Sequence, residues 1–232
     1  MPLSGGIMQY GYQCGMIWGA ALAAGAEAYR LFGVDSQAET RSILAAKRLV
    51  DAFRACSGEI NCLEITDIDK SSSIMKMIFV FLIKGKTIGC MRMSAKYAQA
   101  AFNEINIESP IPPVGCTTML ARKIGLSEMH TVMVAGLAGG IGLCGGACGA
   151  LGAAIWILGM NSIIRKSANK IDYKDPKALD IIDRFLKCTD YKFECSDIVG
   201  RKFKNISEHA RYLSDGGCTE IIKMLADTLS AE

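Results

Sequence analysis

Ten cysteines in 232 residues are the side chains of this sequence best suited to chemistry, because most of them recur in the same order. Four cysteines of the first half have counterparts 128 to 134 residues further on: Cys14, Cys56, Cys62 and Cys90 match Cys148, Cys188, Cys195 and Cys218. Thiolates are soft anionic ligands for iron–sulfur clusters, zinc and copper(I), and paired thiols exchange with disulfides. A duplicated set of thiols therefore indicates metal or redox chemistry at two related sites.

The residues beside these cysteines also repeat. The sequence around Cys14, GYQCG, corresponds to GGACG around Cys148. Glycine next to a cysteine lets the backbone approach a bound cluster closely. Glycines also precede Cys90 and Cys218. We expect each of those two thiols to open a helix. The partial positive charge at a helix N-terminus would then favour the thiolate.

We expect different roles for three further cysteines. Cys56 and Cys188 lie on amphipathic patterns, where we expect inert buried thiols that pack like small hydrophobic residues. Cys144 stands four residues before Cys148, so the two would share one face of a continuous helix. That spacing suits a metal pair or a reversible disulfide. Only the second half has it, because Tyr10 occupies the matching place in the first.

Helical spacing dominates the elements that must position these thiols. Apolar residues recur at helical intervals in four segments, Ile43–Phe53, Met93–Ala101, Leu179–Leu186 and Ile221–Leu229. No Asn-Gly or Asp-Gly hairpin joins alternating strands. Three of the five prolines fall within residues 108–115, which a helix does not cross. The sequence therefore predicts an all-α fold of two related helical modules packed together, residues 1–107 and 114–232.

Two apolar segments are ambiguous. Thr131–Met160 contains no charged residue and is long enough for a transmembrane span. Glycines crowd its middle, and each lowers helix propensity by ~1 kcal/mol relative to alanine. We therefore expect a break and a buried helix, and no membrane span. The run Met75–Ile83 has a strand-like composition, but its helical surroundings favour a buried helix.

Composition excludes several classes of protein. The formal charge of +3 is small and no basic stretch is interleaved with aromatic residues, so nucleic-acid binding is not expected. The first residues lack the pattern of a secretory signal, which favours a cytoplasmic protein with reduced thiols. No Cys-x-x-Cys pair, P-loop or dinucleotide fingerprint occurs. His130 and His209 have no counterparts in the other half, and we expect them to be surface or satisfied polar residues.

The second half resembles the C_GCAxxG_C_C family of redox-active proteins, which carry four characteristic cysteines. Cys116 begins a segment similar to the family's opening cysteine helix. Gly139-Gly140-Ile141-Gly142 and then Cys148-Gly149-Ala150-Leu151-Gly152-Ala153 follow. Cys195 and Cys218 resemble the third and fourth cysteines. The resemblance implies that Cys116, Cys148, Cys195 and Cys218 bind an iron–sulfur cluster, with Cys144 as a spare thiol.

The first half resembles a truncated copy. It contains Cys14, Cys62 and Cys90, but a counterpart of Cys116 would precede residue 1. In the second half, the motif glycine arrives one residue early. Three outcomes stay open for the first site: it has three thiolate ligands, or Cys116 or a partner chain supplies a fourth, or it binds nothing.

The resemblance implies an iron–sulfur protein, of the [2Fe–2S] type, with one or two clusters per chain. The family is similar to the non-haem iron portion of split-Soret cytochromes, and no Cys-x-x-Cys-His motif for covalent haem occurs here. We expect an electron carrier of an anaerobe that serves a redox partner protein, and not a stand-alone enzyme. A thiol–disulfide oxidoreductase using Cys144 and Cys148, a zinc or copper module, and a helical scaffold are the alternatives. An apolar, glycine-rich surface is compatible with a homodimer.

Overall fold

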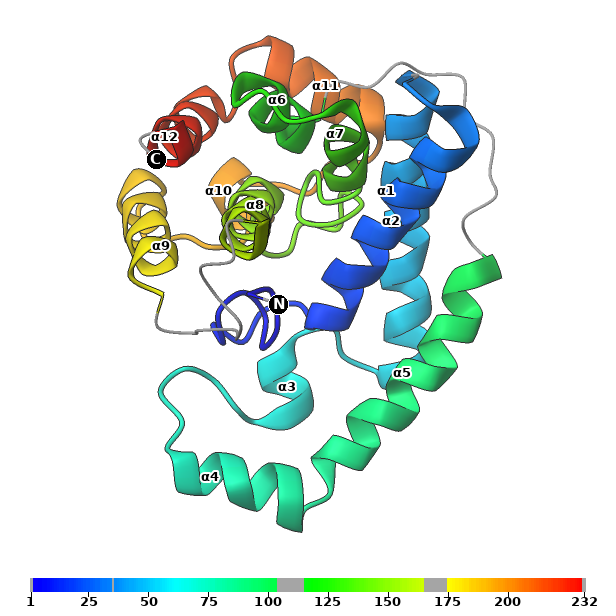
Figure 1. Cartoon of the computed structure of the whole chain (residues 1–232), viewed down its shortest axis with the longest axis vertical. Coiled ribbons are helices and arrows are strands. Elements are labelled where there is room, and N and C mark those ends of the chain that lie inside the picture. The colour runs from blue at the N-terminus through cyan, green and yellow to red at the C-terminus, as the bar shows by residue number, and fades with distance from the viewer. Residues whose placement is uncertain (1, 35, 104–114, 165–174, 231–232) are drawn as a thin grey trace.

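The computed structural model describes residues 2–34, 36–103, 115–164 and 175–230, which form a helical assembly (Figure 1). The first module contains α1 (Gly15–Phe32), α2 (Ser36–Ser57), α3 (Cys62–Thr66), α4 (Ile74–Ile78), the π-helix η1 (Phe79–Ile83) and α5 (Lys86–Asn103). The second contains α6 (Cys116–Lys123), α7 (Glu128–Ala135), α8 (Gly149–Ile164), α9 (Pro176–Cys188), α10 (Cys195–Val199), α11 (Ile206–Ser214) and α12 (Thr219–Ser230). The described residues form no β-strand, which confirms the all-α prediction. Most of the proline-rich segment, residues 108–114, lies outside the described residues.

The second module repeats the order of the first. Helices α8, α9, α10 and α12 correspond to α1, α2, α3 and α5, and α11 stands where α4 and η1 stand. Helices α6 and α7 have no counterpart in the described part of the first module. Helix α7 packs against both α1 and α2. A helix of the second module thus covers part of the first, and both contribute to one hydrophobic core.

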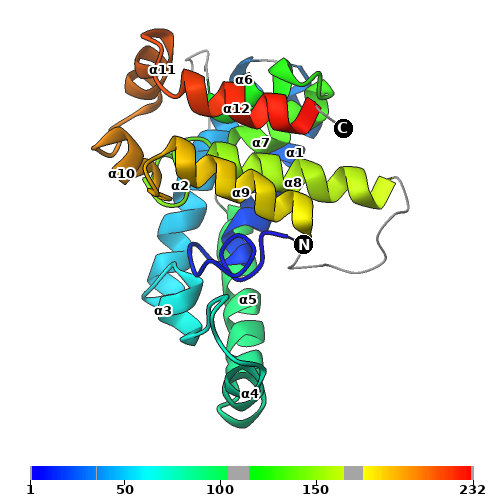
Figure 2. The same ribbon diagram turned by 90° about the vertical axis from the view of Figure 1, so that its left-hand side faces the viewer.

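The predicted apolar stripes point into this core. Phe53 on α2 and Phe185 on α9 are fully buried, as is Trp18 on α1. A Cβ atom at Gly25 would strike the backbone of α7, so glycine is what allows α1 and α7 to approach so closely. Figure 2 shows α8, α9 and α12 lying across the body, with α4 and part of α5 projecting away from it.

An unusual left-handed segment precedes the first helix of each repeat. Backbone φ is positive at residues 5–9 and 11, and again at residues 139–143 and 145, each 134 positions later. The hydrogen bonds repeat as well: Gly11 N–H donates to Gly5 O and Gly145 N–H donates to Gly139 O, at 2.9 and 3.0 Å. Consecutive left-handed residues are costly for residues with a Cβ atom. The repeated glycines lower that cost, and Gly142 has no room for a side chain beside the backbone of α2.

This segment interrupts the uncharged stretch, as its glycines predict. Helix α7 ends at Ala135 and α8 begins at Gly149. Helix α8 is buried over most of its length, with Leu151 and Ile155 fully inaccessible. Among the described residues, no helix combines the length and the apolar character needed to cross a bilayer.

The run Met75–Ile83 is helical but not buried, so the predicted burial is wrong. Of the residues in α4 and η1, Val80 alone reaches the interior. The physical reason is position: these two elements lie on the projecting part of the first module, beyond the core that α1 and α2 form (Figure 2). Most apolar side chains of the run are therefore exposed at the surface.

Candidate functional site

In the second module, an isolated antiparallel β-bridge holds two cysteines next to each other. Ala147 pairs with Glu194. The N–H of Cys148 donates to Phe193 O at 2.9 Å, and the N–H of Cys195 donates to Gly146 O at 2.7 Å. Cys148 directly precedes α8 and Cys195 is the first residue of α10. The bridge thus brings two helix starts, each with a cysteine, to one place.

Two more thiols reach the same region from other helices. Cys116 begins α6, and Cys218 directly precedes α12 with a left-handed φ of 60°. Burial raises the pKa of Cys195, and the neighbouring Cys148, Cys116 and Cys218 thiols raise it further. Burial also raises the pKa of Cys116, with Cys218 and Cys148 adding to the rise. The four cysteines are therefore electrostatic neighbours, although 102 residues separate the first from the last.

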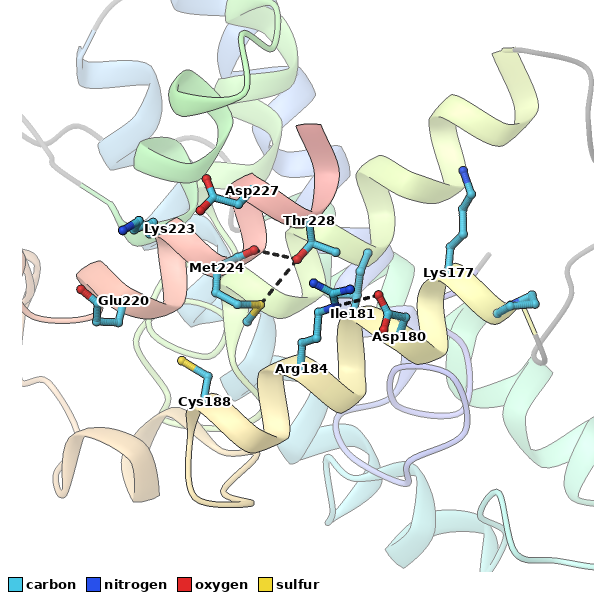
Figure 3. Close-up of a pocket in the computed structure, with 11 residues that line it drawn as sticks. Lys177, Asp180, Ile181, Arg184, Cys188, Glu220, Lys223, Met224, Asp227 and Thr228 are labelled. Carbon is cyan, nitrogen blue, oxygen red and sulfur yellow. Dashed lines mark hydrogen bonds and ion pairs between the residues drawn. The ribbon is translucent and has the colours of Figure 1, made fainter. Parts of the chain in front are cut away.

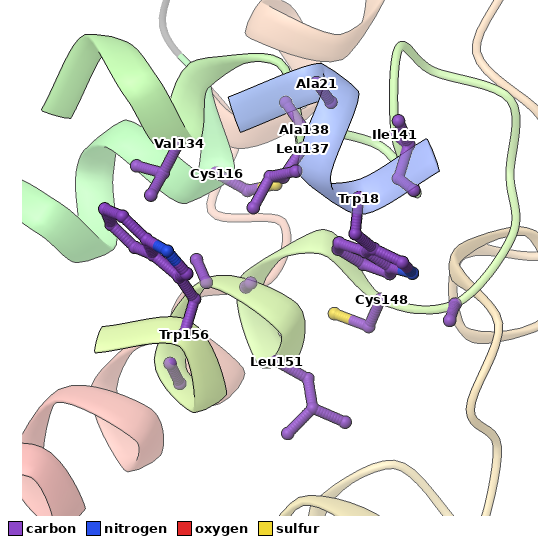
Figure 4. Packing of buried hydrophobic residues seen from close by; sticks show 14 of the residues in the cluster. Trp18, Ala21, Cys116, Val134, Leu137, Ala138, Ile141, Cys148, Leu151 and Trp156 are labelled. Atoms are coloured by element: carbon purple, nitrogen blue, oxygen red, sulfur yellow. The ribbon is translucent and has the colours of Figure 1, made fainter. Parts of the chain in front are cut away.

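Backbone N–H groups face these thiols. Burial raises the pKa of Cys148 to about 12, and the N–H groups of Leu151 and Ala150, in the first turn of α8, oppose that rise. The N–H groups of Gly139 and Thr117 act on Cys116 in the same direction. Such donors stabilise negative charge on sulfur. Figure 4 shows Cys116 and Cys148 with Trp18 and Leu137 in the apolar surroundings of the core.

A tyrosine supplies one further polar contact. Burial raises the pKa of the Cys218 thiol, and a hydrogen bond from the Tyr212 side chain lowers it. Burial likewise raises the pKa of the Tyr212 hydroxyl, and the Cys218 and Cys195 thiols add to this rise. Tyr212 lies on α11, six residues before Cys218. It is a site residue that sequence reasoning missed, because no counterpart in the first half drew attention to it.

The first module repeats the bridge with its own thiols. Gln13 pairs with Asn61, the Cys14 N–H donates to Ile60 O at 2.8 Å, and the Cys62 N–H donates to Tyr12 O at 2.7 Å. These bonds match those of Cys148 and Cys195 one for one. The duplication seen in the cysteine spacing is thus also a duplication of backbone geometry.

Cys14, Cys62 and Cys90 are neighbours in the first module. Burial raises the pKa of Cys14 to about 11, with the Cys62 and Cys90 thiols contributing to the rise. All three are half-buried, whereas Cys116, Cys148 and Cys195 are buried. The expectation that Cys90 opens a helix is wrong, because it is the fifth residue of α5. One helical turn of α5, Lys86–Gly89, precedes Cys90, whereas α12 begins directly after Cys218.

Tyr97 also faces the first group of thiols. Its hydroxyl is buried and has no hydrogen-bond partner in the part of the chain that the structure describes. Burial raises the pKa of this phenol, and the Cys14 and Cys56 thiols raise it further. The ring packs edge-on against Phe53, with the two centroids 5.0 Å apart. The sequence predicted only that Tyr97 lies on the apolar stripe of α5, because a tyrosine at such a position is usually an ordinary core residue.

The two sites are joined through Gln13. This side chain is fully buried, accepts a hydrogen bond from Ala147 N–H at 2.8 Å and donates to Gly140 O at 3.2 Å. It fills the space over Gly146, where a Cβ atom would collide with its amide. The Tyr12 ring stacks on Phe193, with centroids 4.2 Å apart. The signal for Gln13 in the sequence was a difference between the repeats, because Ala147 stands at its counterpart.

Three cysteines remain outside the two groups, although Cys144 adds to the raised pKa of Cys195. Cys56 and Cys188 are exposed, so the prediction that they are buried is wrong. Each lies near the end of its helix, where the amphipathic pattern no longer fixes the buried face. Cys188 lies at one end of a surface cleft of about 650 Å³ between α9 and α12, beside Met224 and Glu220 (Figure 3).

Cys144 does not share a helix face with Cys148. It lies between the left-handed residues Leu143 and Gly145, before α8, and its Sγ donates to Gly140 O at 2.7 Å. It lines a cleft of about 270 Å³ between the two bridges, together with Arg54 and Lys202. The premise of a continuous helix through both cysteines is therefore wrong, because the glycines break it.

The two histidines differ from each other. His130 is half-buried, and its Nδ1 lies 2.9 Å from the Ser127 hydroxyl. His209 is buried against Phe203, and among the described residues its Nδ1 has no hydrogen-bond partner, so the expectation of a surface or satisfied residue is wrong for it. Burial lowers the pKa of His209 to about 4.

The chemistry of the thiols fits an iron–sulfur cluster. Four thiols converge from four elements, and backbone N–H groups face them. Gly149 leaves no room for a side chain against the Leu137 carbonyl group. Within the described residues, no three His, Cys, Asp or Glu side chains are arranged as a formed metal site. The thiols are thus neighbours that fit the group chemically, and they are not a preformed ligand set.

Comparison with known families gives one match that spans both modules. The family described as "putative redox-active protein (C_GCAxxG_C_C)" matches residues 1–103 and again residues 115–231. The tandem duplication is therefore real at the level of the family. No curated protein and no solved structure matches the chain.

Proposed function

The chain belongs to the C_GCAxxG_C_C family of redox-active proteins, and on that premise we propose that it is an iron–sulfur electron carrier. In the second module, Cys116, Cys148, Cys195 and Cys218 would hold a cluster of the [2Fe–2S] type. The cluster supplies a one-electron couple. The protein would accept one electron from a reduced donor and pass it to an oxidised partner protein.

The observation that carries this proposal is the gathering of four thiols at or just before the starts of four helices, two of which a backbone bridge joins. Burial makes deprotonation of each unfavourable, and neighbouring thiols add to the cost at Cys116, Cys148 and Cys195. A bound cationic iron centre removes that cost, because it stabilises thiolates directly. Four converging thiols, three of them buried and Cys218 half-buried, are therefore easier to explain as ligands than as packing.

The protein's own residues would bind and shield the cluster. Backbone N–H groups at the start of α8 would donate to the Cys148 sulfur, as they do to the thiol. Tyr212 would keep its contact with Cys218. Trp18 and Leu137 would exclude water from the buried side. Hydrogen bonds to sulfur and the degree of burial are the properties that set the potential of such a centre.

The first module would hold a second, more open site. Cys14, Cys62 and Cys90 are its thiols, and Tyr97 is the buried polar group beside them. Cys116 is an electrostatic neighbour of Cys148 and Cys218, so we assign it to the second site. The first site would then have three thiolates and one position for a non-cysteine ligand.

The proposal is tested by quantifying iron, zinc and acid-labile sulfide after anaerobic reconstitution. We expect iron and sulfide in equal amounts and visible absorbance that bleaches with dithionite. Cys62→Ser separates the two sites, because it should remove only the share of iron held by the first module. Zinc without sulfide would support a zinc module instead, and protein without iron and sulfide would contradict the proposal.

A thiol–disulfide function is the second candidate, and the cleft beside Cys144 favours it. Burial raises the pKa of this thiol, and the Gly146 N–H, the Gln13 side chain and the Arg54 and Lys202 cations that line the cleft oppose that rise. Exchange at this thiol would need no metal. A Cys144→Ser variant that keeps its iron but loses reversible two-electron thiol titration would favour this second function.

A further inference from the structure

The first module carries an arm, formed by α4, η1 and the first half of α5, whose outer face is strongly apolar. Eight large apolar side chains on it are exposed: Ile74, Met75, Ile78, Phe79, Leu82, Ile83, Ile88 and Met91. Ile74 and Leu82 are 72% and 73% accessible. Scattered exposed apolar residues are normal on a protein surface, whereas a contiguous group of this size marks an interaction site.

Six of these side chains form one stripe along α4 and η1. They occur in adjacent pairs at residues 74–75, 78–79 and 82–83, a spacing of four. In an α-helix such a stripe slowly drifts around the axis, because a turn has 3.6 residues. The wider π-helical turn at Phe79–Ile83 counteracts the drift. Val80 lies on the opposite side and is buried.

The fold itself does not require this apolar face, as the second repeat shows. Helix α11 occupies the matching place, and its apolar residues Ile206 and Leu213 point inward, 5% and 3% exposed. The exposed positions of α11 carry polar residues such as Ser207 and Arg211. The outward apolar face is thus specific to the first repeat and is not explained by packing of the module.

The arm is also strongly basic. Residues 74–94, which make up the arm, contain four Lys and Arg residues, Lys76, Lys84, Lys86 and Arg92, and none of the 23 Asp and Glu residues. The cations flank the apolar stripe. Lys84 lies over the Phe79 ring, 5.5 Å from its centroid, and Lys86 Nζ donates to Ile65 O at 2.8 Å. Within the described residues, one ion pair involves the arm: Lys76 Nζ lies 3.3 Å from Asp67 Oδ2.

We propose that the arm docks on the surface of an anionic phospholipid bilayer, with the apolar stripe in the interface and the flanking cations on the headgroups. An exposed apolar face bordered by lysines is the pattern of interfacial helices. A second copy of the chain is a poorer occupant, because two arms of the same charge would meet. The helices of the arm are too short to span the bilayer, so the contact lies on the surface.

This placement gives the first thiol group a definite orientation. Cys90 lies on α5 between Ile88 and Met91, two of the exposed residues of the arm. Docking would therefore hold the more open thiol group at the membrane side of the molecule. The buried second group would face away, because it lies in the body from which the arm projects (Figure 2).

Flotation with vesicles tests the docking. The full chain is mixed with vesicles of 70% phosphatidylcholine and 30% phosphatidylglycerol, or of phosphatidylcholine alone. We expect the chain to float with the anionic vesicles, more weakly with the neutral ones, and less in high salt. The double variant Leu82→Glu/Ile83→Glu should bind on the order of tenfold more weakly or worse, since it removes two apolar anchors.

Val34→Glu is the matched control, because Val34 is 65% exposed and lies outside the arm. It should float like the unchanged chain. Circular dichroism establishes that both variants keep their helical content, which is expected for substitutions at exposed positions. Failure of the unchanged chain to float with anionic vesicles overturns the proposal. Equal vesicle binding by the Leu82→Glu/Ile83→Glu variant overturns it too. So does a stable dimer of the unchanged chain that is absent in this variant, because the apolar face would then be a dimer interface.

Discussion

At the residue scale, ten chemically identical side chains fall into distinct environments. Four are mutual neighbours in the second module and three in the first, whereas Cys56 and Cys188 are exposed and Cys144 lines a polar cleft. The repeat in the sequence identified three cysteines of each group, and the family resemblance added Cys116. It could not show that Cys56 and Cys188 are exposed, because position along an amphipathic helix does not fix which edge of the face is covered.

The four-thiol assignment predicts different effects for two cysteines of the same module. Cys195→Ser should remove the cluster share of the second module, since this thiol neighbours the other three proposed ligands, Cys116, Cys148 and Cys218. Cys188→Ser should leave iron content unchanged, because this thiol is exposed. Iron and sulfide analysis of both variants, prepared in parallel, makes the comparison. An equal loss of iron in the two would contradict the assignment.

His209 predicts a loss of stability in mild acid. Burial depresses its folded pKa to about 4, below the ordinary value near 6.5. Folding therefore keeps it neutral, and its contribution is complete above pH ~6.5 and is lost as the pH falls towards 4. Between pH 7 and 5 the free energy of unfolding should fall by ~2 kcal/mol from this residue. Denaturant titrations of the unchanged chain and His209→Leu, at both pH values, measure the difference; a variant with the same pH dependence would refute this.

At the element scale, helices were predictable and the segments between them were not. Helical periodicity located α2, α5, α9 and α12, and glycine density predicted the break before α8. The left-handed segments escaped notice, because positive φ depends on hydrogen bonds such as Gly11 N–H to Gly5 O. The π-helix η1 was equally hidden, since no residue type marks a widened turn.

Two glycines near the starts of α1 and α8 should respond oppositely to alanine. At Gly149 a Cβ atom would collide with the Leu137 carbonyl group, so Gly149→Ala should cost ~1–3 kcal/mol. Gly19 has open space around it within α1, and Gly19→Ala should stabilise by up to ~1 kcal/mol. Thermal unfolding of the two variants measures both signs. Destabilisation by both would mean that the packing around α1 is tighter than described.

At the scale of the whole molecule, the two modules form one body around two unlike thiol groups. The duplication predicted the relationship between the modules but not how they pack. That packing depends on differences between the repeats: α7 has no counterpart in the described first module, and Gln13 reaches into the second. A repeat comparison registers such features only as mismatches, so their structural role was not predictable.

Gln13 tests whether the modules behave as one unit. Gln13→Ala should destabilise the protein by ~1–3 kcal/mol, because the Ala147 N–H and the Gly140 carbonyl lose their buried partner. Asn61→Ala is the control, since Asn61 is the bridge partner of Gln13 and its side chain makes no capping hydrogen bond. Chemical denaturation compares the variants. Equal, small effects of both changes would show that Gln13 is not a structural link.

The proposed iron–sulfur cluster of the second module rests on Cys116, Cys148, Cys195 and Cys218. Electron paramagnetic resonance of the anaerobically reconstituted, dithionite-reduced chain tests it most directly. The account predicts a signal from a reduced cluster that persists in Cys188→Ser and is diminished or lost in Cys195→Ser. A chain that gives no signal and contains no acid-labile sulfide, or a signal that is the same in both variants, would contradict it.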